Sequence, residues 1–328
     1  MIRYYARPIM LSTIIFVVLC VGLVINNSIE DTYQSPETVS FDKEAAMMLP
    51  GSINLSIDNA IVPRTDTENA SLFSDCYYAL MVGVDDNEVY AAKNAHKRMY
   101  PASLTKLMTA IVVCEKIEAG EISLDDVVTV SKRYDLTSEG VGPCELGYGC
   151  EITVKDLLYT LLIQSNNYYA LILADYVCDS TADFCELMNN KAMEIGATNT
   201  HFENPHGLDS RNHYSTAYDI YLIIKEAYSH DIIRTIDTYE TYAYSYYNQN
   251  GYRIDADISA TNLFMNNNVA LPANYEIKVW KTGTTDAAGN CLALYITKEK
   301  KSYVVIASNP VSKPQLYNYM VKLMCLVN

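Results

Sequence analysis

The sequence predicts one α/β domain of the α+β kind, in which strands from both ends of the chain form an antiparallel sheet packed with helices. Near the start, two apolar runs in CYYALMVGVDDNEVYAA flank Asp85-Asp86-Asn87, a pattern typical of a β-hairpin. Three further β-rich runs, EIKVWKTG, CLALYITK and SYVVIASN, lie near the C-terminus. Helical periodicity dominates the middle, roughly 124–228. We therefore expect a mostly helical subdomain inserted between the two sets of strands.

Composition limits the kinds of partner. The chain has 328 residues, half of them apolar, which is enough for a sizeable core. Its 39 acidic residues outnumber 24 basic ones and give a formal charge of -15. This charge repels phosphate backbones, so we predict no nucleic-acid partner.

The N-terminus has the pattern of a membrane-targeting segment. Arg3 and Arg7 precede an apolar run from Ile9 to Ile25, and no small-x-small cleavage site follows. We predict that residues 1–28 form an uncleaved anchor in the cell membrane, with the rest of the chain outside the cytoplasm. The alternative is a cleaved signal and a secreted protein. The polar stretch 29–74 is interpreted as a linker, and 75–328 as the folded domain.

Cysteine and histidine positions do not predict a metal site. Eight cysteines lie outside the apolar run, and an even number in an exported domain permits disulfides. The best local pairs are Cys144 with Cys150 and Cys178 with Cys185, but the sequence leaves their redox state open. No C-x-x-C pair occurs. The histidines in HFENPHGLDSRNH lack the spacing of H-E-x-x-H, so we interpret them as loop scaffolding; they are His201, His206 and His213.

A tyrosine-rich stretch, YETYAYSYYNQNGY, alternates Tyr242, Tyr244 and Tyr246. Alternation with period two is typical of a strand. We therefore predict a surface β-ribbon here rather than a platform on which ligands stack.

One short motif suggests nucleophilic chemistry. In PASLTKLMTA, Ser103 lies three residues before Lys106 at the start of an apolar helical pattern. Residues three apart share a helix face, so the lysine amine can reach the serine hydroxyl. A lysine acts as a base if desolvation and a nearby positive charge lower its pKa. Taken alone, however, S-x-x-K is more often an N-cap serine before an ordinary helix.

Two further motifs follow in order. LLIQSNN offers Ser165 and Asn167 as an S-x-N triplet, and KVWKTGTTDAAGN offers K-T-G at the end of a predicted strand, beginning at Lys281. The set S-x-x-K, S-x-N and K-T-G in this order is typical of penicillin-binding proteins and β-lactamases. From Cys76 to its end, the chain resembles the D-alanyl-D-alanine carboxypeptidases among the low-molecular-mass penicillin-binding proteins. The stretches YPASLTKLMTA, ENPHGLDSRNHYSTAYDI and ATNLFMNNN carry the same resemblance.

The resemblance implies the β-lactamase and penicillin-binding-protein fold and a role for each motif residue. Ser103 would be the nucleophile, Lys106 its base, and Ser165 the relay that passes a proton to the leaving amine. The backbone N–H groups of Ser103 and Thr284 would form an oxyanion hole. The residues implied in substrate binding are Asn167, Lys281, Thr282, Gly283 and Thr284.

The implied function is a serine-type D-Ala-D-Ala carboxypeptidase that removes the terminal D-alanine from peptidoglycan stem peptides. β-Lactams would acylate Ser103 as covalent inhibitors, and no cofactor is implied. The alternatives are a β-lactamase, a D,D-transpeptidase or endopeptidase on the same fold, and a catalytically silent β-lactam-sensing module. The sequence does not decide which of these activities predominates. It also leaves open the third residue of the stem peptide and the oligomeric state.

Three features depart from the family or test the alternatives. Tyr168 and Tyr169 follow Asn167 where the family has a small acidic-Ala step, so we expect a different pocket rim. The chain after Gly283 suffices only to finish the sheet and one helix, so we expect no extra C-terminal β-domain. Glu186 and Asn190 have a spacing found in class A β-lactamases, but they fall in an amphipathic helical pattern, and we expect a solvated helix face there.

Overall fold

The computed structural model describes residues 59–178 and 180–327. The chain divides into two compact units, and all described residues belong to the second, Asn54–Asn328. The predicted anchor at 1–28 and most of the predicted linker lie outside the described residues. Among the residues that are described, no helix combines the length and the apolar character needed to cross a membrane.

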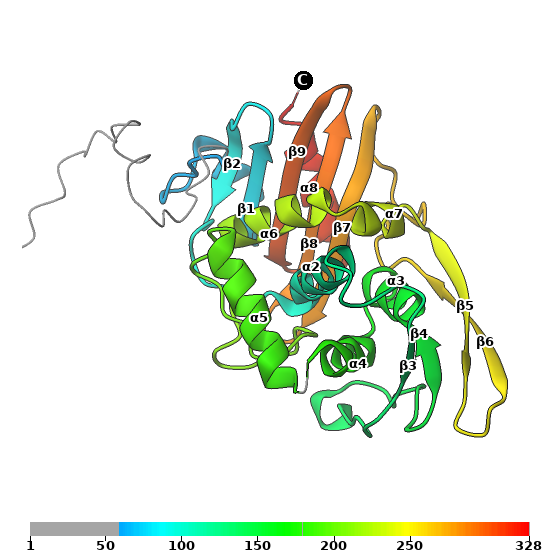
Figure 1. Ribbon diagram of the computed structural model, residues 1–328. Coiled ribbons are helices and arrows are strands. Elements are labelled where there is room, and N and C mark those ends of the chain that lie inside the picture. Colours follow the sequence, from blue (N-terminus) through cyan, green and yellow to red (C-terminus); the bar gives the residue numbers. More distant parts are fainter. Residues whose placement is uncertain (1–58, 179, 328) are drawn as a thin grey trace, which may run out of the picture. The chain divides into compact units, whose positions relative to one another are not determined.

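The main sheet joins the two ends of the domain. It has five antiparallel strands in the order β2-β1-β9-β8-β7 (Figure 1). The strands are β1 (Cys76–Gly83), β2 (Val89–Lys93), β7 (Tyr275–Thr285), β8 (Gly289–Lys298) and β9 (Lys301–Pro310). β9 pairs with β1 through Leu80 and Ile306, and with β8 through Leu294 and Val305. The predicted antiparallel sheet from N-terminal and C-terminal strands is therefore confirmed.

Helices cover both faces of this sheet. α6 (Ala217–Ser229) contacts β1, β7, β8 and β9, and α8 (Lys313–Met324) contacts β1, β8 and β9 on the other face (Figure 1). The run from Tyr303 to Ala307 in β9 is buried without interruption. Successive residues of a strand point to opposite faces, so an uninterrupted buried run requires cover on both sides.

The inserted region is mostly helical, as predicted, but it also contains a second sheet. Its four strands run in the order β3-β4-β5-β6. The strands β3 and β4 have three residues each, too few for a period-two pattern to be visible in the sequence. The elements of this region are β3 (Val127–Thr129), η4 (Thr137–Glu139), β4 (Glu151–Thr153), α3 (Val154–Ile163), α4 (Asn167–Val177), α5 (Thr181–Glu194), α7 (Asp231–Ile236), β5 (Thr241–Tyr247) and β6 (Arg253–Ser259).

The central helix of the fold is α2 (Thr105–Glu118). All residues from Thr105 to Cys114 are buried, because α2 packs against α3, α4, α5 and α6. A helix that is covered on every side is apolar all round, which explains its weak amphipathic pattern. The sequence placed the helix start near Ser103. In the structure Ser103 lies in a 3-10 turn, η3 (Ala102–Leu104), and the α-helix begins two residues after it, at Thr105.

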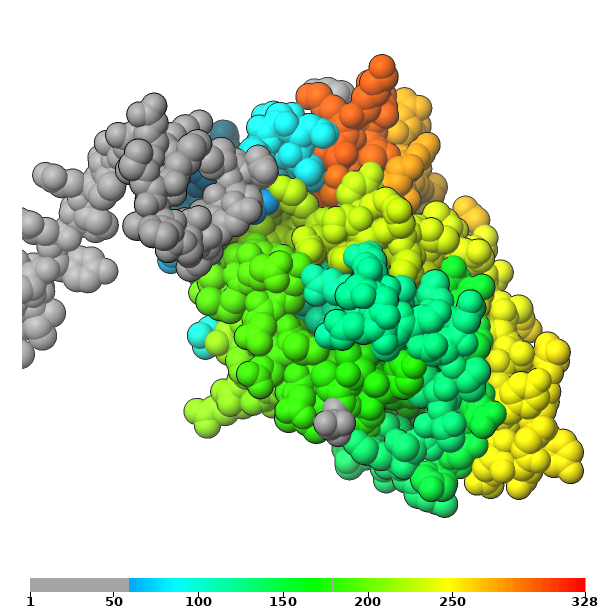
Figure 2. Space-filling model, in the orientation of Figure 1, coloured from blue at the N-terminus to red at the C-terminus, as the bar shows by residue number. Residues whose placement is uncertain are grey.

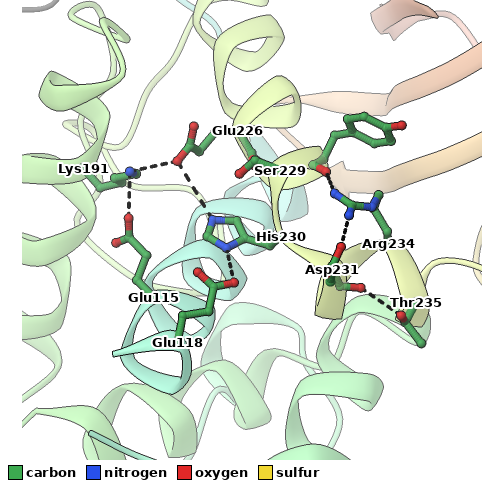
Figure 3. A network of polar contacts seen from close by, with 10 residues as sticks. Glu115, Glu118, Lys191, Glu226, Ser229, His230, Asp231, Arg234 and Thr235 are labelled. Atoms are coloured by element: carbon green, nitrogen blue, oxygen red, sulfur yellow. Dashed lines mark hydrogen bonds and ion pairs between the residues drawn. The ribbon is translucent and has the colours of Figure 1, made fainter. Parts of the chain in front are cut away.

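The far end of α2 is held by a network of ion pairs (Figure 3). Lys191 of α5 lies 2.7 Å from Glu115 of α2 and 2.8 Å from Glu226 of α6. His230 Nδ1, just beyond α6, is 2.9 Å from Glu118 Oε1. Burial lowers the pKa of Lys191, but the hydrogen bonds to Glu115 and Glu226 outweigh it and raise the pKa above its ordinary value. One buried cation thus joins three helices.

The domain begins earlier than the sequence indicated. Residues 59–74 were assigned to the linker, but Ala60, Val62 and Phe73 are buried, and η2 (Glu68–Phe73) packs against β2. The Thr67 N–H also donates to Ala92 O over 2.9 Å. Isolated apolar residues in a polar stretch have no periodicity, and the sequence pattern therefore missed this segment.

The tyrosine-rich stretch forms the predicted β-ribbon of β5 and β6, which lies beside the helical region (Figure 2). Tyr242, Tyr244 and Tyr246 share one face of β5, with ring centroids 6.3 and 6.5 Å apart. This face is packed: Tyr242 donates to Asp156 of α3, and the Tyr244 hydroxyl is 2.9 Å from that of Tyr169 in α4. The interpretation as a structural ribbon is therefore correct.

Neither candidate disulfide is formed among the described residues. Cys144 is not bonded to Cys150, and Cys178 is not bonded to Cys185. The Cys144 thiol instead donates to Leu146 O at 3.1 Å.

Candidate active site

Ser103 lies in η3, where the backbone makes an unusual turn. The residue before it, Ala102, has a φ of 48°, in the left-handed region that L-residues rarely adopt. Gly207 packs directly against this turn. A Cβ on Gly207 would lie 1.9 Å from Ala102 O, so only glycine permits the approach. The strained turn is thus held from outside, as is common at functional sites.

Lys106, the second residue of α2, points its amine at Ser103. Its Nζ is 2.8 Å from Ser103 Oγ, 2.6 Å from Asn167 Oδ1 and 2.6 Å from His206 O. Its side chain is fully buried. Burial, and after it the charge of Lys281, holds the pKa of Lys106 well below the usual value for lysine.

These three contacts suit an uncharged amine. A neutral amine has two N–H donors and one lone pair. The oxygens of Asn167 and His206 can only accept, so they take the two N–H groups. The lone pair is then left for the Ser103 hydroxyl, which can donate. The Ser103 hydroxyl and the Lys106 amine therefore lie in the geometry that a nucleophile and its base require.

The S-x-N motif occupies the turn between α3 and α4. Ser165 has a φ of 66°, and the next residue, Asn166, caps α4 by accepting from the N–H groups of Tyr168 and Tyr169. Asn167 is the first residue of α4 and contacts Lys106. The turn is thus anchored by its middle residue, which leaves Ser165 and Asn167 on either side of the cap.

The K-T-G motif reaches the same place from the sheet. It lies on β7, an edge strand of the main sheet. A Cβ on Gly283 would lie 3.0 Å from Ala102 Cβ and 3.0 Å from Ser103 N, which is tighter than ordinary contact. Glycine therefore lets β7 approach the serine turn. The structure brings all three motifs together around Ser103.

The free edge of β7 presents amide groups to this place. In an antiparallel pair, successive residues direct their N–H groups alternately toward the partner strand and away from it. The Trp280 N–H points away from β8, because it donates to Asp237 Oδ2 over 2.8 Å. No register shift separates Trp280 from Thr284, so the Thr282 and Thr284 amides have the same orientation. The Thr284 amide therefore lies on the open edge, beside the contact between Gly283 and Ser103.

A buried acid accompanies the K-T-G lysine. Lys281 and Asp237 are both fully buried. Burial lowers the pKa of Lys281 to about 7, with Asp237 acting in the opposite direction. Burial likewise raises the pKa of Asp237 to about 8, opposed by the Trp280 N–H and by Lys281. Asp237 Oδ1 has no hydrogen-bond partner among the described residues. Sequence reasoning missed Asp237 because no motif surrounds it.

Two of the motif residues, Asn167 and Thr284, line a groove of about 580 Å³. The Thr282 hydroxyl is 2.6 Å from Thr261 Oγ1, and the Thr284 hydroxyl donates to Gly283 O over 2.8 Å. The remaining lining residues are Glu139, Gly140, Val141, Leu208, Asp209, Thr285 and Asp286.

Two of the three histidines support the back of the site. His213 Nδ1 accepts from the Glu203 N–H, so its Nε2 donates to the Thr105 hydroxyl at 2.8 Å. Burial lowers the pKa of His206 to about 3, so the imidazole is neutral. The interpretation of these histidines as loop scaffolding is correct. It did not anticipate that His206 O would contact Lys106.

The sequence departs from the family pattern directly after Asn167, and Tyr168 at that position contacts the rim of the groove. Its hydroxyl donates to Gly142 O over 2.8 Å and accepts from the Leu136 N–H over 3.2 Å. Both partners belong to the loop that supplies Glu139, Gly140 and Val141 to the groove. The tyrosine thus anchors that side of the rim. Glu186 and Asn190 are exposed on α5, as expected for a solvated helix face.

Comparison with known proteins gives the family. The family model described as D-alanyl-D-alanine carboxypeptidase matches residues 66–309. The chain belongs to the D-alanyl-D-alanine carboxypeptidase family. Among curated members, DacF of Bacillus subtilis is 34% identical over 185 residues, which cover 56% of this chain and 47% of the relative. DacC of Escherichia coli is 34% identical over 223 residues, which cover 67% of this chain and 52% of the relative. The chain thus spans about half the length of these relatives.

Solved structures show the same fold. The Streptomyces K15 DD-transpeptidase aligns with a TM-score of 0.69 and 24% identity, covering 77% of this chain and 96% of that one. Penicillin-binding protein D2 from Listeria monocytogenes, in its ampicillin-bound form, aligns with a TM-score of 0.62 and 26% identity. This alignment also covers 77% of this chain and 96% of that one. The predicted penicillin-binding-protein fold is confirmed.

Proposed function

We propose that this chain is a serine-type D-Ala-D-Ala carboxypeptidase that removes the terminal D-alanine from peptidoglycan stem peptides. The observation that carries the proposal is the 2.8 Å contact between the Lys106 amine and the Ser103 hydroxyl. The pKa of this amine is lowered first by burial, which makes it available as a base. Family membership supplies the substrate class, because the curated relatives are named for this activity.

The proposed first step forms an ester. Ser103 Oγ attacks the carbonyl carbon of the penultimate D-alanine while its proton moves to Lys106 Nζ. The amide N–H groups of Ser103 and Thr284 hold the developing oxyanion, each with an effect of about 3 kcal/mol on the barrier. The C–N bond then breaks, and Ser165 passes a proton to the nitrogen of the departing D-alanine. Water hydrolyses the ester and returns Ser103 to its hydroxyl form.

The other motif residues bind the substrate in this proposal. Asn167 holds Lys106 and the peptide amide. Lys281, with the hydroxyls of Thr282 and Thr284, takes the free carboxylate of the terminal D-alanine. Gly283 leaves room for the peptide to lie along the β7 edge as an added strand. β-Lactams occupy the same place and acylate Ser103. Residues 1–28 tether the enzyme to the outer face of the cell membrane.

Two reagents test the function. The purified full chain is incubated with a fluorescent penicillin and, separately, with diacetyl-Lys-D-Ala-D-Ala. Covalent labelling together with release of D-alanine is the expected result. Labelling without release would point to a silent sensor, and rapid consumption of penicillin would point to a β-lactamase.

The variant Ser103→Ala separates the mechanism from the fold. We expect it to lose both labelling and D-alanine release while its circular dichroism stays that of the parent. Ser229→Ala, an exposed serine at the end of α6, is the matched control and should keep both activities. D-alanine release by Ser103→Ala would overturn the proposed acyl-enzyme.

A further inference from the structure

A second cavity lies beyond one wall of the groove. It has a volume of about 330 Å³, and no residue of the three motifs lines it. Its lining comes from β1, from the segment before η3, from the loop after Asp209, from the β7–β8 turn and from the end of β9. The lining residues are Tyr78, Arg98, Met99, Tyr100, Arg211, Tyr214, Ala287, Ala288 and Asn309. We call it the arginine pocket.

The arginine pocket and the groove share a partition. One side of the β7–β8 turn, at Thr285, lines the groove, and Ala287 lines the arginine pocket. Asp209 fixes this partition, because its carboxylate accepts from the Thr285 hydroxyl over 2.6 Å and from the Ala287 N–H over 3.1 Å. Beyond Asp209, the loop turns Arg211 and Tyr214 into the arginine pocket. The two cavities are therefore neighbours with separate linings.

The charge of the arginine pocket is opposite to that of the protein. Its lining contains two guanidinium groups and no carboxylate, although the whole chain carries a formal charge of -15. Among the ion pairs found between described residues, none includes Arg98 or Arg211. Arg98 and Arg211 are both exposed, and both line the cavity. Two cations along one cavity give it a positive potential, which attracts an anion.

Arg98 is also held in place. Its guanidinium carbon lies 3.8 Å from the ring centroid of Tyr214, a close stacking contact. The backbone on both sides is fixed, because Met99 and Ser215 exchange hydrogen bonds of 2.8 and 2.9 Å, and Tyr78 donates to Arg98 O over 2.7 Å. A guanidinium fixed in this way loses little freedom when it binds a ligand.

From these contacts we infer that the arginine pocket binds the anionic group of a ligand, a carboxylate or a phosphate. Planar guanidinium forks match the oxygens of both groups. The tyrosine rings offer an apolar wall for the carbon atoms next to the anion. This site is independent of the proposed catalytic activity, since none of the catalytic side chains lines it. It would hold a second part of a wall polymer, or a separate anionic molecule, beside the groove.

Calorimetric titration of the purified full chain in detergent at low salt tests the inference. The probes are inorganic phosphate and glutarate, which distinguish a phosphate source from a carboxylate source. We expect one site, and binding about tenfold weaker or more in Arg211→Ala, the loss typical for one charge-assisted hydrogen bond. Arg253→Ala, which removes the same charge from the exposed ribbon, should bind like the parent.

A preference for phosphate would assign the pocket to phosphate-bearing ligands, and a preference for glutarate to carboxylate-bearing ones. Tyr214→Leu, which removes the stacking partner of Arg98, should also weaken binding while leaving the charge unchanged. The inference is wrong if neither probe binds, or if Arg253→Ala weakens binding as much as Arg211→Ala does. D-alanine release by the parent is measured separately, so failure of one proposal is distinguishable from failure of the other.

Discussion

At the scale of single residues, the site depends on the protonation states of its buried amines and of a buried carboxyl. Lys106 reaches Ser103 because it lies three residues further along the chain, and the burial of this part of α2 lowers its pKa. Lys281 adds a second buried amine, and Asp237 adds a carboxyl that opposes the loss of its proton. The charge on Lys281 therefore depends on a residue that does not itself touch Ser103 in the structure.

The variant Asp237→Asn tests this dependence. The asparagine oxygen can still accept from the Trp280 N–H, but the ionisable carboxyl that opposes the loss of the Lys281 proton is gone. Lys281 should then lose its proton at lower pH. If charged Lys281 binds the substrate carboxylate, KM for diacetyl-Lys-D-Ala-D-Ala rises as pH increases through the pKa of Lys281. We expect this rise to begin at lower pH in the variant, as measured by steady-state kinetics between pH 5 and pH 9, roughly the range in which buried lysines titrate. An unchanged pH profile would exclude the role of Asp237.

At the scale of elements, the site requires a close approach of β7 to η3. Gly283→Ala adds a methyl group 3.0 Å from Ser103 N, so the strand or the turn must move by a few tenths of an ångström. We expect the rate of acylation by fluorescent penicillin to fall by about tenfold, because positioning errors well below 1 Å already slow such reactions. Gly147→Ala, which has open space around it, should react at the parent rate. Equal rates for both variants would show that the contact is not needed.

The outer end of α2 provides a second test at this scale. Lys191→Met removes the cation that joins α2, α5 and α6 and leaves Glu115 and Glu226 facing each other (Figure 3). The free energy of unfolding should fall by about 2 kcal/mol, since Glu115 and Glu226 lose the buried cation that they share. Urea unfolding measures this change. The control Lys116→Met breaks a more exposed pair with Glu121 and should cost about 0.5 kcal/mol or less. A smaller loss of unfolding free energy for Lys191→Met than for the control would contradict a stabilising role of the ion-pair network.

At the scale of the whole molecule, the two ends of the domain fold as one unit. β9 lies between β1 from the start of the domain and β8 from its end. The ladder between β1 and β9 can form only when both ends of the domain are in place. Hydrogen exchange measured by mass spectrometry should therefore show β1, β8 and β9 exchanging slowly and together. The tip of the β5–β6 ribbon, at Asn248–Tyr252, should exchange much faster because it is exposed. Separate, faster exchange of β1 would contradict this cooperativity.

Parts of this architecture were predictable because they rest on local patterns. The hairpin around Asp85-Asp86-Asn87, the alternating tyrosines and the amphipathic helices each follow from side-chain periodicity. The short strands β3 and β4 and the packed segment 59–74 have no such pattern, and they form because neighbouring elements supply their partners. Prediction therefore failed where structure depends on tertiary contact rather than on local sequence.

By itself, the sequence determined the fold class and the order of the three motifs, because helix faces, strand alternation and turn residues are properties of short segments. Only the tertiary structure decided which atoms meet: that His206 O and Asn167 Oδ1 occupy the two N–H groups of Lys106, that Gly207 and Gly283 admit close backbone approach, and that Asp237 lies beside the K-T-G strand. These contacts join residues far apart in the chain. Their energies depend on burial and on distances that no local pattern encodes.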